Sequence, residues 1–245
     1  MNKHHLGRAL LLALLAGLAA PSAASALNVY TASSLRDVFT QIDGAATYNF
    51  LGSNQLQLQI ERGAPADVFA SASPQEAQAL FRGGHCDRPV TFATNKLALL
   101  VPKGNPGHIR SVYSLRTGTR RLAVGNKGVP VGSYTRTLLR RLGLSRILTT
   151  NTVSQESNVA GIVSKIALGS ADAGFAYVTD GRIASARVDV IRLPRYAQPP
   201  VRYQACRVVR GGADAGGAAA FIAKLRSTRG RQLLKRAGFG LPPKG

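Results

Sequence analysis

The chain has 245 residues, of which 45% are hydrophobic, and its 32 lysines and arginines against 11 aspartates and glutamates give a formal net charge of +21. This composition fits a globular protein with one large domain or two smaller lobes, and it excludes disordered and collagen-like chains. The absence of tryptophan, the single methionine and the 6% of aromatic residues argue against a haem or flavin site. The excess positive charge indicates anionic surroundings or partners and carries no information on the fold.

The first 26 residues have the pattern of a secretory signal peptide that is cleaved after Ala26. Lys3 and Arg8 precede an apolar run over 9–20, and the small residues at 24–26 close the segment. The apolar run is shorter than the roughly 20 residues that span a bilayer. We therefore expect a periplasmic protein whose formal charge falls from +21 to +19, because Lys3 and Arg8 are lost with the leader.

Strands and helices alternate along the first part of the remaining chain. The residues 54–61 alternate like a strand, but Leu56 and Ile60 also have helical spacing, and we predict a helix there. Ser73 followed by Pro74 is a typical helix start. The predicted strands are 27–31, 47–51, 67–71 and 97–101, and the predicted helices are 35–42, 54–61 and 74–81. This alternation predicts an α/β fold with a mostly parallel sheet.

Two clusters of proline and glycine divide the chain, one at 102–106 and one at 194–200. Between and after them we predict strands over 121–124, 173–178, 188–193 and 201–209, and helices over 132–142, 158–168 and 218–237. The Gly/Ala-rich stretch 211–220 is interpreted as a flexible loop. The clusters predict two lobes, each with its own sheet, joined by a hinge with a cleft between them. Residues 27–101 plus 200–245 form lobe 1 in this prediction, and 102–199 form lobe 2.

The two cysteines, Cys86 and Cys206, would be exported together. An even pair in an oxidising compartment favours one disulfide, and two separate buried thiols are the alternative. Besides these, the chain after Ala26 keeps only His85 and His108 as soft metal ligands. We therefore expect no metal site.

Catalytic motifs are missing from the sequence. It contains no Gly-x-Ser-x-Gly elbow, Walker A loop, Gly-x-Gly-x-x-Gly after a strand or His-Glu-x-x-His. A serine hydrolase would need a base, and His85 and His108 lie far along the chain from the serine-rich segments. An enzyme therefore has no support in these motifs, and we predict that the protein is not one.

Serines stand at two predicted strand-to-helix junctions. Ser34 follows the first strand and Ser53 follows the second. In a parallel sheet these junctions lie at the carboxyl ends of the strands, where ligands bind. A helix start offers unpaired backbone N–H groups and the positive end of the helix dipole, and a serine hydroxyl adds a donor, so such a site suits an anion. The commoner role of serine at these positions is that of an ordinary helix cap.

Several segments resemble the periplasmic molybdate-binding proteins of ABC importers, and the resemblance covers nearly the whole exported chain. Its most specific part is the Gly-Ala-Pro-Ala-Asp block at 63–67, for which we expect a structural turn without ligand contact. The matching segments are 27–35, 50–53, 60–72, 122–125, 129–134, 157–159 and 171–180.

The resemblance implies a two-lobed periplasmic-binding-protein fold and a tetrahedral oxyanion, molybdate or tungstate, held by neutral donors. Carried over by motif, these donors are the hydroxyl and N–H groups of Ser34 and Ser53, the N–H groups of Val131 and Val159, and the hydroxyl of Tyr177. Without the resemblance, Tyr177 would be interpreted as a core aromatic. The implied partner is an ABC permease in the inner membrane. No cofactor and a monomeric state are expected.

The chain departs from the family pattern in three places. The segment between Leu35 and Phe50 is several residues shorter, Asn54 stands where Gly or Ser is usual, and Val131 stands where Ala is common. The preference among molybdate, tungstate and sulfate therefore stays open. The alternative function is a basic exported protein that binds polyanions. Because the basic residues are dispersed, we expect a solvated basic surface and no specific nucleic-acid site.

Overall fold

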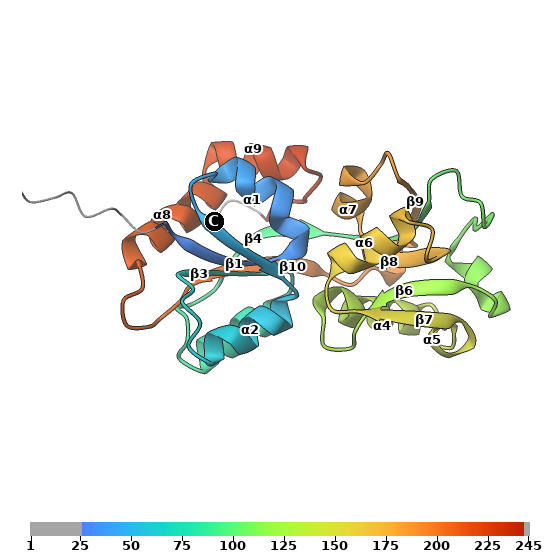
Figure 1. Ribbon diagram of the computed structural model, residues 1–245, viewed down its shortest axis with the longest axis horizontal. Helices are drawn as coiled ribbons and strands as arrows, with labels where there is room; N and C mark the ends of the chain where they lie inside the picture. Colours follow the sequence, from blue (N-terminus) through green and yellow to red (C-terminus); the bar gives the residue numbers. More distant parts are fainter. Residues whose placement is uncertain (1–25, 243–245) are drawn as a thin grey trace, which may run out of the picture.

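The computed structural model describes residues 26–242, and Figure 1 shows them as two lobes side by side. The predicted signal peptide, 1–26, lies outside the described residues except for Ala26. Each lobe is built on one five-stranded mixed sheet flanked by helices, as predicted. In the part of the chain that is described, no helix is both long and apolar enough to cross a membrane.

The first lobe contains the sheet β2-β1-β3-β10-β4. Four of its strands point the same way, and only β10 runs antiparallel to its neighbours. Helices cover both faces, with α1, α8 and α9 on one and α2 and α3 on the other (Figure 1). The elements are β1 (Asn28–Ala32), η1 (Ser33–Leu35), α1 (Arg36–Ile42), β2 (Thr47–Leu51), α2 (Ser53–Glu61), β3 (Val68–Ser71), α3 (Pro74–Arg82), β4 (Val90–Asn95), β10 (Val201–Arg207), α8 (Ala215–Arg226) and α9 (Thr228–Arg236). Because helices cover both faces, every residue of β3 is buried.

The second lobe contains the sheet β7-β6-β8-β5-β9, in which β5 is the strand that runs antiparallel to its neighbours. Helix α4 packs on one face, and α6 and α7 pack on the other (Figure 1). The elements are β5 (Leu97–Pro102), η2 (Val112–Thr117), β6 (Arg121–Gly125), α4 (Pro130–Arg141), α5 (Ile147–Thr150), β7 (Thr152–Glu156), α6 (Val159–Ala167), β8 (Ala173–Tyr177), α7 (Val178–Ile183), β9 (Val188–Arg192) and η3 (Arg195–Ala197).

The crossing between the lobes lies earlier than predicted. We expected residues 97–101 in lobe 1 and a crossing at 102–106, but β5 pairs with β8 and β9 in the second sheet. The chain therefore crosses at Lys96, between β4 and β5, and returns between β9 and β10. The breaker cluster at 102–106 ends a strand inside the second lobe, where the backbone N–H of Asn105 donates to the carbonyl of Pro102. Proline and glycine mark a turn, and they do not show which sheet the preceding strand joins.

Three further predictions were wrong or incomplete. Helix α8 starts at Ala215, inside the stretch interpreted as a loop, because Asp214 caps it by accepting the N–H of Gly217 at 2.8 Å. The single helix predicted over 218–237 is two helices, separated at Ser227, whose hydroxyl caps α9. Strands β4 and β7 were missed. The residues of β7, Thr-Val-Ser-Gln-Glu, lack an apolar alternation because β7 is an edge strand.

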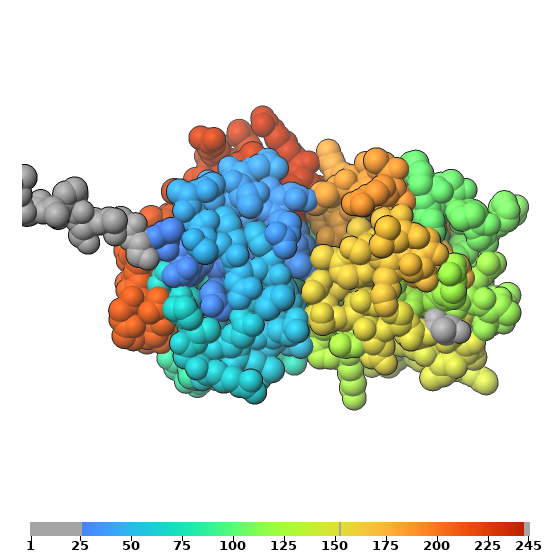
Figure 2. Space-filling view, viewed as in Figure 1, coloured from blue at the N-terminus to red at the C-terminus, as the bar shows by residue number. Residues whose placement is uncertain are grey.

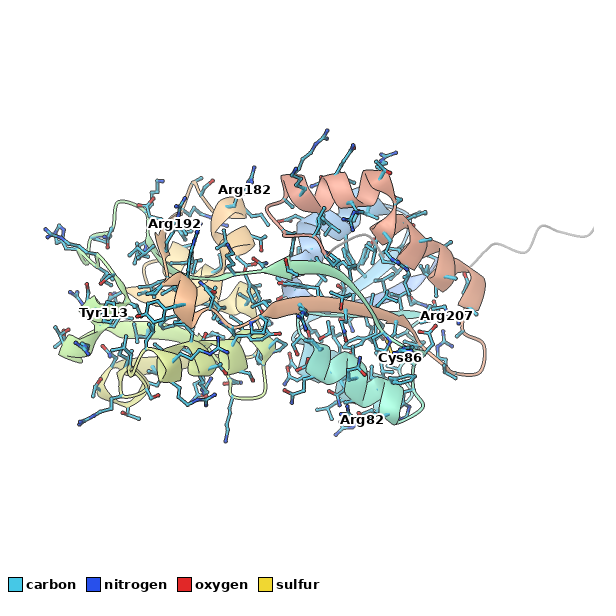
Figure 3. All side chains as sticks on the ribbon, turned by 180° about the vertical axis from the view of Figure 1, so that it is seen from behind. Arg82, Cys86, Tyr113, Arg182, Arg192 and Arg207 are labelled. Atoms are coloured by element: carbon cyan, nitrogen blue, oxygen red, sulfur yellow. A yellow bond between two sulfur atoms is a disulfide. The ribbon has the colours of Figure 1, made fainter. Side chains whose placement is uncertain are left out.

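A disulfide joins Cys86 and Cys206, which confirms the predicted pair. Their Cα atoms lie 6.0 Å apart, and the bond links the turn after α3 to β10 (Figure 3). Both cysteines belong to a buried apolar cluster with Leu56, Phe69 and Leu80, between the sheet and the helices α2 and α3. The cross-link therefore ties the turn after α3 to the sheet of the first lobe.

Candidate anion-binding site

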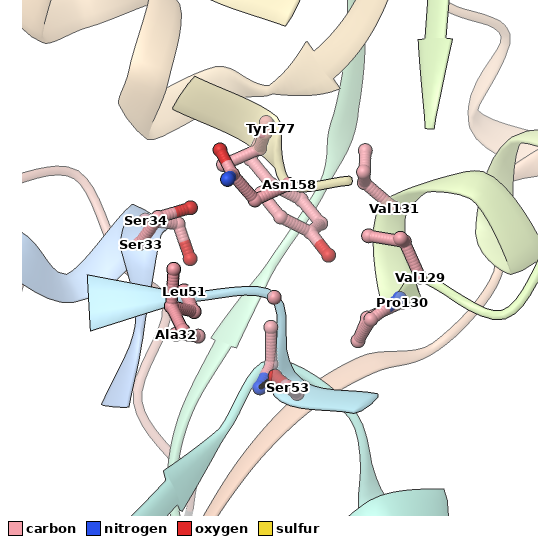
Figure 4. A pocket seen from close by; sticks show the side chains of 13 residues that line it. Ala32, Ser33, Ser34, Leu51, Ser53, Val129, Pro130, Val131, Asn158 and Tyr177 are labelled. Atoms are coloured by element: carbon pink, nitrogen blue, oxygen red, sulfur yellow. Dashed lines mark hydrogen bonds between the residues drawn. The ribbon is translucent and has the colours of Figure 1, made fainter. Parts of the chain in front are cut away.

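A small cavity lies where the two lobes meet, along the seam between the blue–cyan and the yellow–gold surfaces in Figure 2. The space inside it that the centre of a water molecule could reach measures about 10 Å³. This size suits a compact ion and excludes a sugar or a peptide. Its walls come from strand ends and helix starts of both lobes (Figure 4). They consist of Ala32, Ser33, Ser34, Leu51, Gly52, Ser53, Ala72, Val129, Pro130, Val131, Asn158, Val159 and Tyr177.

The first lobe supplies two serine hydroxyls. Ser34 lies in η1, directly after β1, and is 5% exposed, and Ser53 is the first residue of α2 and is 1% exposed. Each hydroxyl oxygen already has a protein partner: Ser34 Oγ lies 3.0 Å from the hydroxyl of Tyr203, and Ser53 Oγ accepts the N–H of Ala72 at 3.1 Å. The protein therefore holds both hydroxyls in position at the cavity wall.

The second lobe supplies backbone N–H groups at two helix starts. Val131 is the second residue of α4, after Pro130, and Val159 is the first residue of α6. Residues in the first turn of a helix have no acceptor for their N–H within the helix. Asn158 caps α6 by accepting the N–H of Gly161 at 3.1 Å, which leaves the N–H of Val159 for another acceptor. The valine side chains are buried, so their contribution to the cavity is shape together with the N–H donor.

Tyr177 closes the cavity from the second lobe. It ends β8, is 1% exposed, and its hydroxyl has no hydrogen-bond partner among residues 26–242. Figure 4 shows this hydroxyl directed into the space between Ser34 and Val131. Burial raises the pKa of the phenol well above its ordinary value, so the group stays protonated and can donate. An unpaired buried hydroxyl is costly, and a bound acceptor would remove that cost.

Asp180 holds the backbone of Tyr177 on the side away from the cavity. Its carboxylate accepts the backbone N–H of Tyr177 at 2.9 Å, at the start of α7. The carboxyl is 7% exposed, and its burial raises its pKa to about 7. The acidic group thus lies next to the cavity wall without lining the cavity.

The electrostatics of the cavity favour an anion without any full charge. Within residues 26–242, the lining residues include no Asp, Glu, Lys, Arg or His. Helices α2, α4 and α6 all begin at the cavity, so the positive ends of three helix dipoles meet there. Neutral donors directed at one small space are an arrangement that binds an oxyanion through its oxygen atoms.

The lobes are in close contact at the cavity. A side chain at Gly52, in the first lobe, would overlap the backbone carbonyl of Ser157 in the second. The absence of a Cβ atom therefore allows the two backbones to approach each other at this point.

All five residues expected at the site, Ser34, Ser53, Val131, Val159 and Tyr177, line this one cavity. The expected structural turn at 63–67 is also found: Asp67 accepts the N–H of Asn28 at 2.8 Å and pairs with Arg210 at 2.7 Å, away from the cavity.

Other lining residues were not expected. Asn158 could have been found, because an asparagine before an apolar helix is a typical cap, whereas Pro130 and Ala72 carry no such signal. The described residues also contain no cluster of three potential metal ligands.

Three comparisons place the chain among known proteins. Residues 27–240 match the family model described as bacterial extracellular solute-binding protein. The molybdate-binding protein ModA of Mycobacterium tuberculosis is 32% identical over 229 residues, covering 89% of this chain and 86% of the relative. ModA of Escherichia coli is 29% identical, covering 87% and 88%. The periplasmic molybdate-binding protein of Azotobacter vinelandii superposes with a TM-score of 0.80 at 26% identity, covering 89% of this chain and all of that structure.

Proposed function

Because the chain belongs to the bacterial extracellular solute-binding protein family, we propose that it captures molybdate outside the cytoplasm and delivers it to an ABC importer. The observation that carries this proposal is the small cavity lined by neutral donors from both lobes, at the positions of Ser34, Ser53, Val131, Val159 and Tyr177. The similar proteins named above are molybdate-binding proteins.

The number of donors is sufficient for tight binding of an oxyanion. A hydrogen bond to a charged group contributes about 1.5–3 kcal/mol, so several preorganised donors reach micromolar affinity or better. Neither lobe carries the full set: the two serines lie in the first lobe, and Val131, Val159 and Tyr177 lie in the second. The ion therefore stabilises the closed arrangement of the lobes, in which all its oxygen atoms have donors.

Selection among anions follows from the size of the ion and from whether its oxygen atoms carry a proton. Tungstate carries the same charge and shape as molybdate, and we propose that it binds to the same donors. Sulfate is smaller and leaves part of the donor set at longer distance. Phosphate at neutral pH carries a proton that needs an acceptor, and the neutral donors offer none.

Delivery follows from hinge closure between the lobes. The crossings at Lys96 and between β9 and β10 are the positions at which the lobes can rotate. In the periplasm, a permease of the inner membrane would recognise the closed form of a single chain and accept the ion. No bond of the ion is broken in this process, and we assign no catalytic residue and no cofactor.

A thermal-shift panel tests the proposed function. A ligand that binds only the folded protein raises its melting temperature. At fixed salt concentration, molybdate and tungstate should raise the melting temperature, sulfate should raise it less, and phosphate and a short DNA duplex should leave it unchanged. A response to DNA alone would favour the alternative of a basic protein that binds polyanions, and a flat response to every oxyanion would refute the proposal.

A further inference from the structure

A chain of hydrogen bonds runs from the crossing between the lobes to the cavity. We propose that Tyr203, held by Asn95, is a positioning residue that forces the hydroxyl of Ser34 to donate its proton into the cavity. Through this polarity the pair determines specificity for fully deprotonated oxyanions. The inference rests on the proposed function, because it concerns the same cavity.

The contacts connect residues that are distant in sequence. Tyr203 lies in β10, is completely buried, and its hydroxyl is 3.0 Å from Ser34 Oγ. Asn95 is the last residue of β4, directly before the crossing at Lys96. Its Nδ2 lies 3.4 Å from the hydroxyl of Tyr203 and 2.9 Å from Oγ1 of Thr179, in α7 of the second lobe.

The direction of the chain follows from Asn95. Its Oδ1 accepts the backbone N–H of Lys96 at 2.9 Å, so the amide nitrogen must face Tyr203 and Thr179. An amide nitrogen only donates, and therefore the hydroxyl oxygen of Tyr203 accepts from Asn95. The single proton of Tyr203 is then free for Ser34. Burial raises the pKa of Tyr203, so this proton is retained.

The contact with Tyr203 fixes the direction in which the hydroxyl of Ser34 donates its proton. When its oxygen accepts the proton of Tyr203, its own proton is directed elsewhere, and the cavity is the space that Ser34 lines. Ser53 has the same polarity by a different route, since its oxygen accepts the N–H of Ala72 at 3.1 Å. Each serine oxygen therefore already accepts a hydrogen bond inside the protein, and its proton is the part of the hydroxyl that is left for the cavity. An oxyanion oxygen without a proton matches them, whereas a protonated oxygen would face a donor and lose its partner.

Tyr203 also has a packing role, which the test must separate from positioning. Its ring makes edge contacts with Tyr177 at 5.9 Å and with Phe239 at 5.3 Å between ring centroids. Tyr203→Phe keeps these contacts and removes only the hydroxyl. The matched control is Tyr48→Phe, which removes a tyrosine hydroxyl in the same lobe that donates to the backbone carbonyls of Phe39 and Asp43 and does not line the cavity.

The measurement is the ratio of two dissociation constants at neutral pH, that of molybdate by direct titration and that of phosphate by competition against molybdate. In Tyr203→Phe the hydroxyl of Ser34 can rotate, so we expect molybdate to bind about 3–10-fold more weakly and its advantage over phosphate to shrink by about tenfold. Tyr48→Phe should leave the ratio unchanged.

A second variant reverses the chain. In Asn95→Asp the carboxylate accepts the proton of Tyr203, so Ser34 must donate to Tyr203 and present a lone pair to the cavity. The added negative charge weakens the binding of all anions by a similar factor. The reversed hydroxyl of Ser34 should reduce the advantage of molybdate over phosphate further than Tyr203→Phe does. A folded Tyr203→Phe protein with the wild-type ratio would overturn the inference and leave the proposed function standing. Absence of molybdate binding in the wild type would overturn both.

Discussion

The two lobes contribute to the cavity in different ways. The first lobe presents side-chain hydroxyls whose oxygens already accept or exchange hydrogen bonds within the protein, at Ser34 and Ser53. The second lobe presents backbone N–H groups at Val131 and Val159 and the hydroxyl of Tyr177, which has no partner in the part of the chain that the structure describes. The first-lobe donors thus have partners within the protein, and in our proposal the second-lobe donors gain theirs from the bound ion. The first lobe therefore fixes the direction in which the serine hydroxyls donate. The second lobe holds the donors that would gain acceptors when the lobes close on an ion.

The largest expected effect comes from removing the hydroxyls of the first lobe. Ser34→Ala combined with Ser53→Ala deletes two hydrogen bonds to a charged ligand, each contributing about 1.5–3 kcal/mol. Titration calorimetry should show that molybdate binds roughly two to four orders of magnitude more weakly. The free protein should still fold but melt at a lower temperature, because the buried N–H of Ala72 and the hydroxyl of Tyr203 lose an acceptor.

The matched control is Ser145→Ala combined with Ser164→Ala, two exposed serines of the second lobe. This control should bind like the wild type. Wild-type affinity in the Ser34/Ser53 double variant would refute the assignment of the first-lobe donors.

A pH series sharpens the account of the second lobe. Burial raises the pKa of Asp180 to about 7, so the folded protein holds this proton more tightly than the unfolded chain does. The contribution to stability is therefore present at low pH and is lost as pH rises towards 7. Relative to the wild type, Asp180→Asn should gain about 4 kcal/mol in unfolding free energy between acid and neutral pH, measured by urea denaturation. Parallel pH profiles of the two proteins would contradict this.

Removing one backbone donor tests the second lobe directly. Proline is well tolerated at the first position of a helix, and Asn158 already has the extended conformation that a following proline requires. Val159→Pro should therefore keep α6 and delete the N–H, which weakens molybdate binding by about 1.5–3 kcal/mol. Because the Val159 side chain is buried, its replacement should also lower the melting temperature of the free protein. Thr228→Pro places a proline at the same position of α9, an exposed site, and controls for general effects. Equal affinity of both proline variants would exclude the Val159 N–H as a donor.

The smallest effect is expected at the seam. Gly52→Ala places a methyl group against the carbonyl of Ser157, and overpacking of this kind costs about 1–3 kcal/mol. Small-angle scattering with molybdate should show a more open protein, and affinity should fall about tenfold. Gly44→Ala, where a Cβ meets nothing closer than 3.6 Å, should close normally. If Gly52→Ala closes equally well, the close approach is not required.

The sequence predicted the first-lobe donors better than the second-lobe donors for a physical reason. Serine at a strand-to-helix junction carries its chemistry in the side chain, so Ser34 and Ser53 can be selected by residue type. A backbone N–H donor leaves no trace in residue identity. Val131 and Val159 were therefore found only through the family resemblance, as was the site role of Tyr177.

The hinge shows a second property that the sequence alone does not predict, which is the sheet that a strand joins. The alternation of strands and helices predicted two lobes, but it placed the strand 97–101 in the wrong one, because pairing between sheets depends on contacts distant in sequence. Strand β4 was not predicted either, so the role of Asn95 at its end could not be seen from the sequence. Tyr203 belongs to a predicted strand, but only the fold shows that its hydroxyl reaches Ser34, 169 residues earlier.

The central claim is that neutral donors in the cavity between the lobes, and not the basic surface, bind the ion. Titration of the purified protein with molybdate at low and high salt tests this most directly, because surface charge interactions are screened by salt and buried ones much less so. The account predicts one ion per chain, micromolar or tighter binding, and an affinity that survives high salt. Binding of several ions per chain, lost steeply as salt rises, would contradict it.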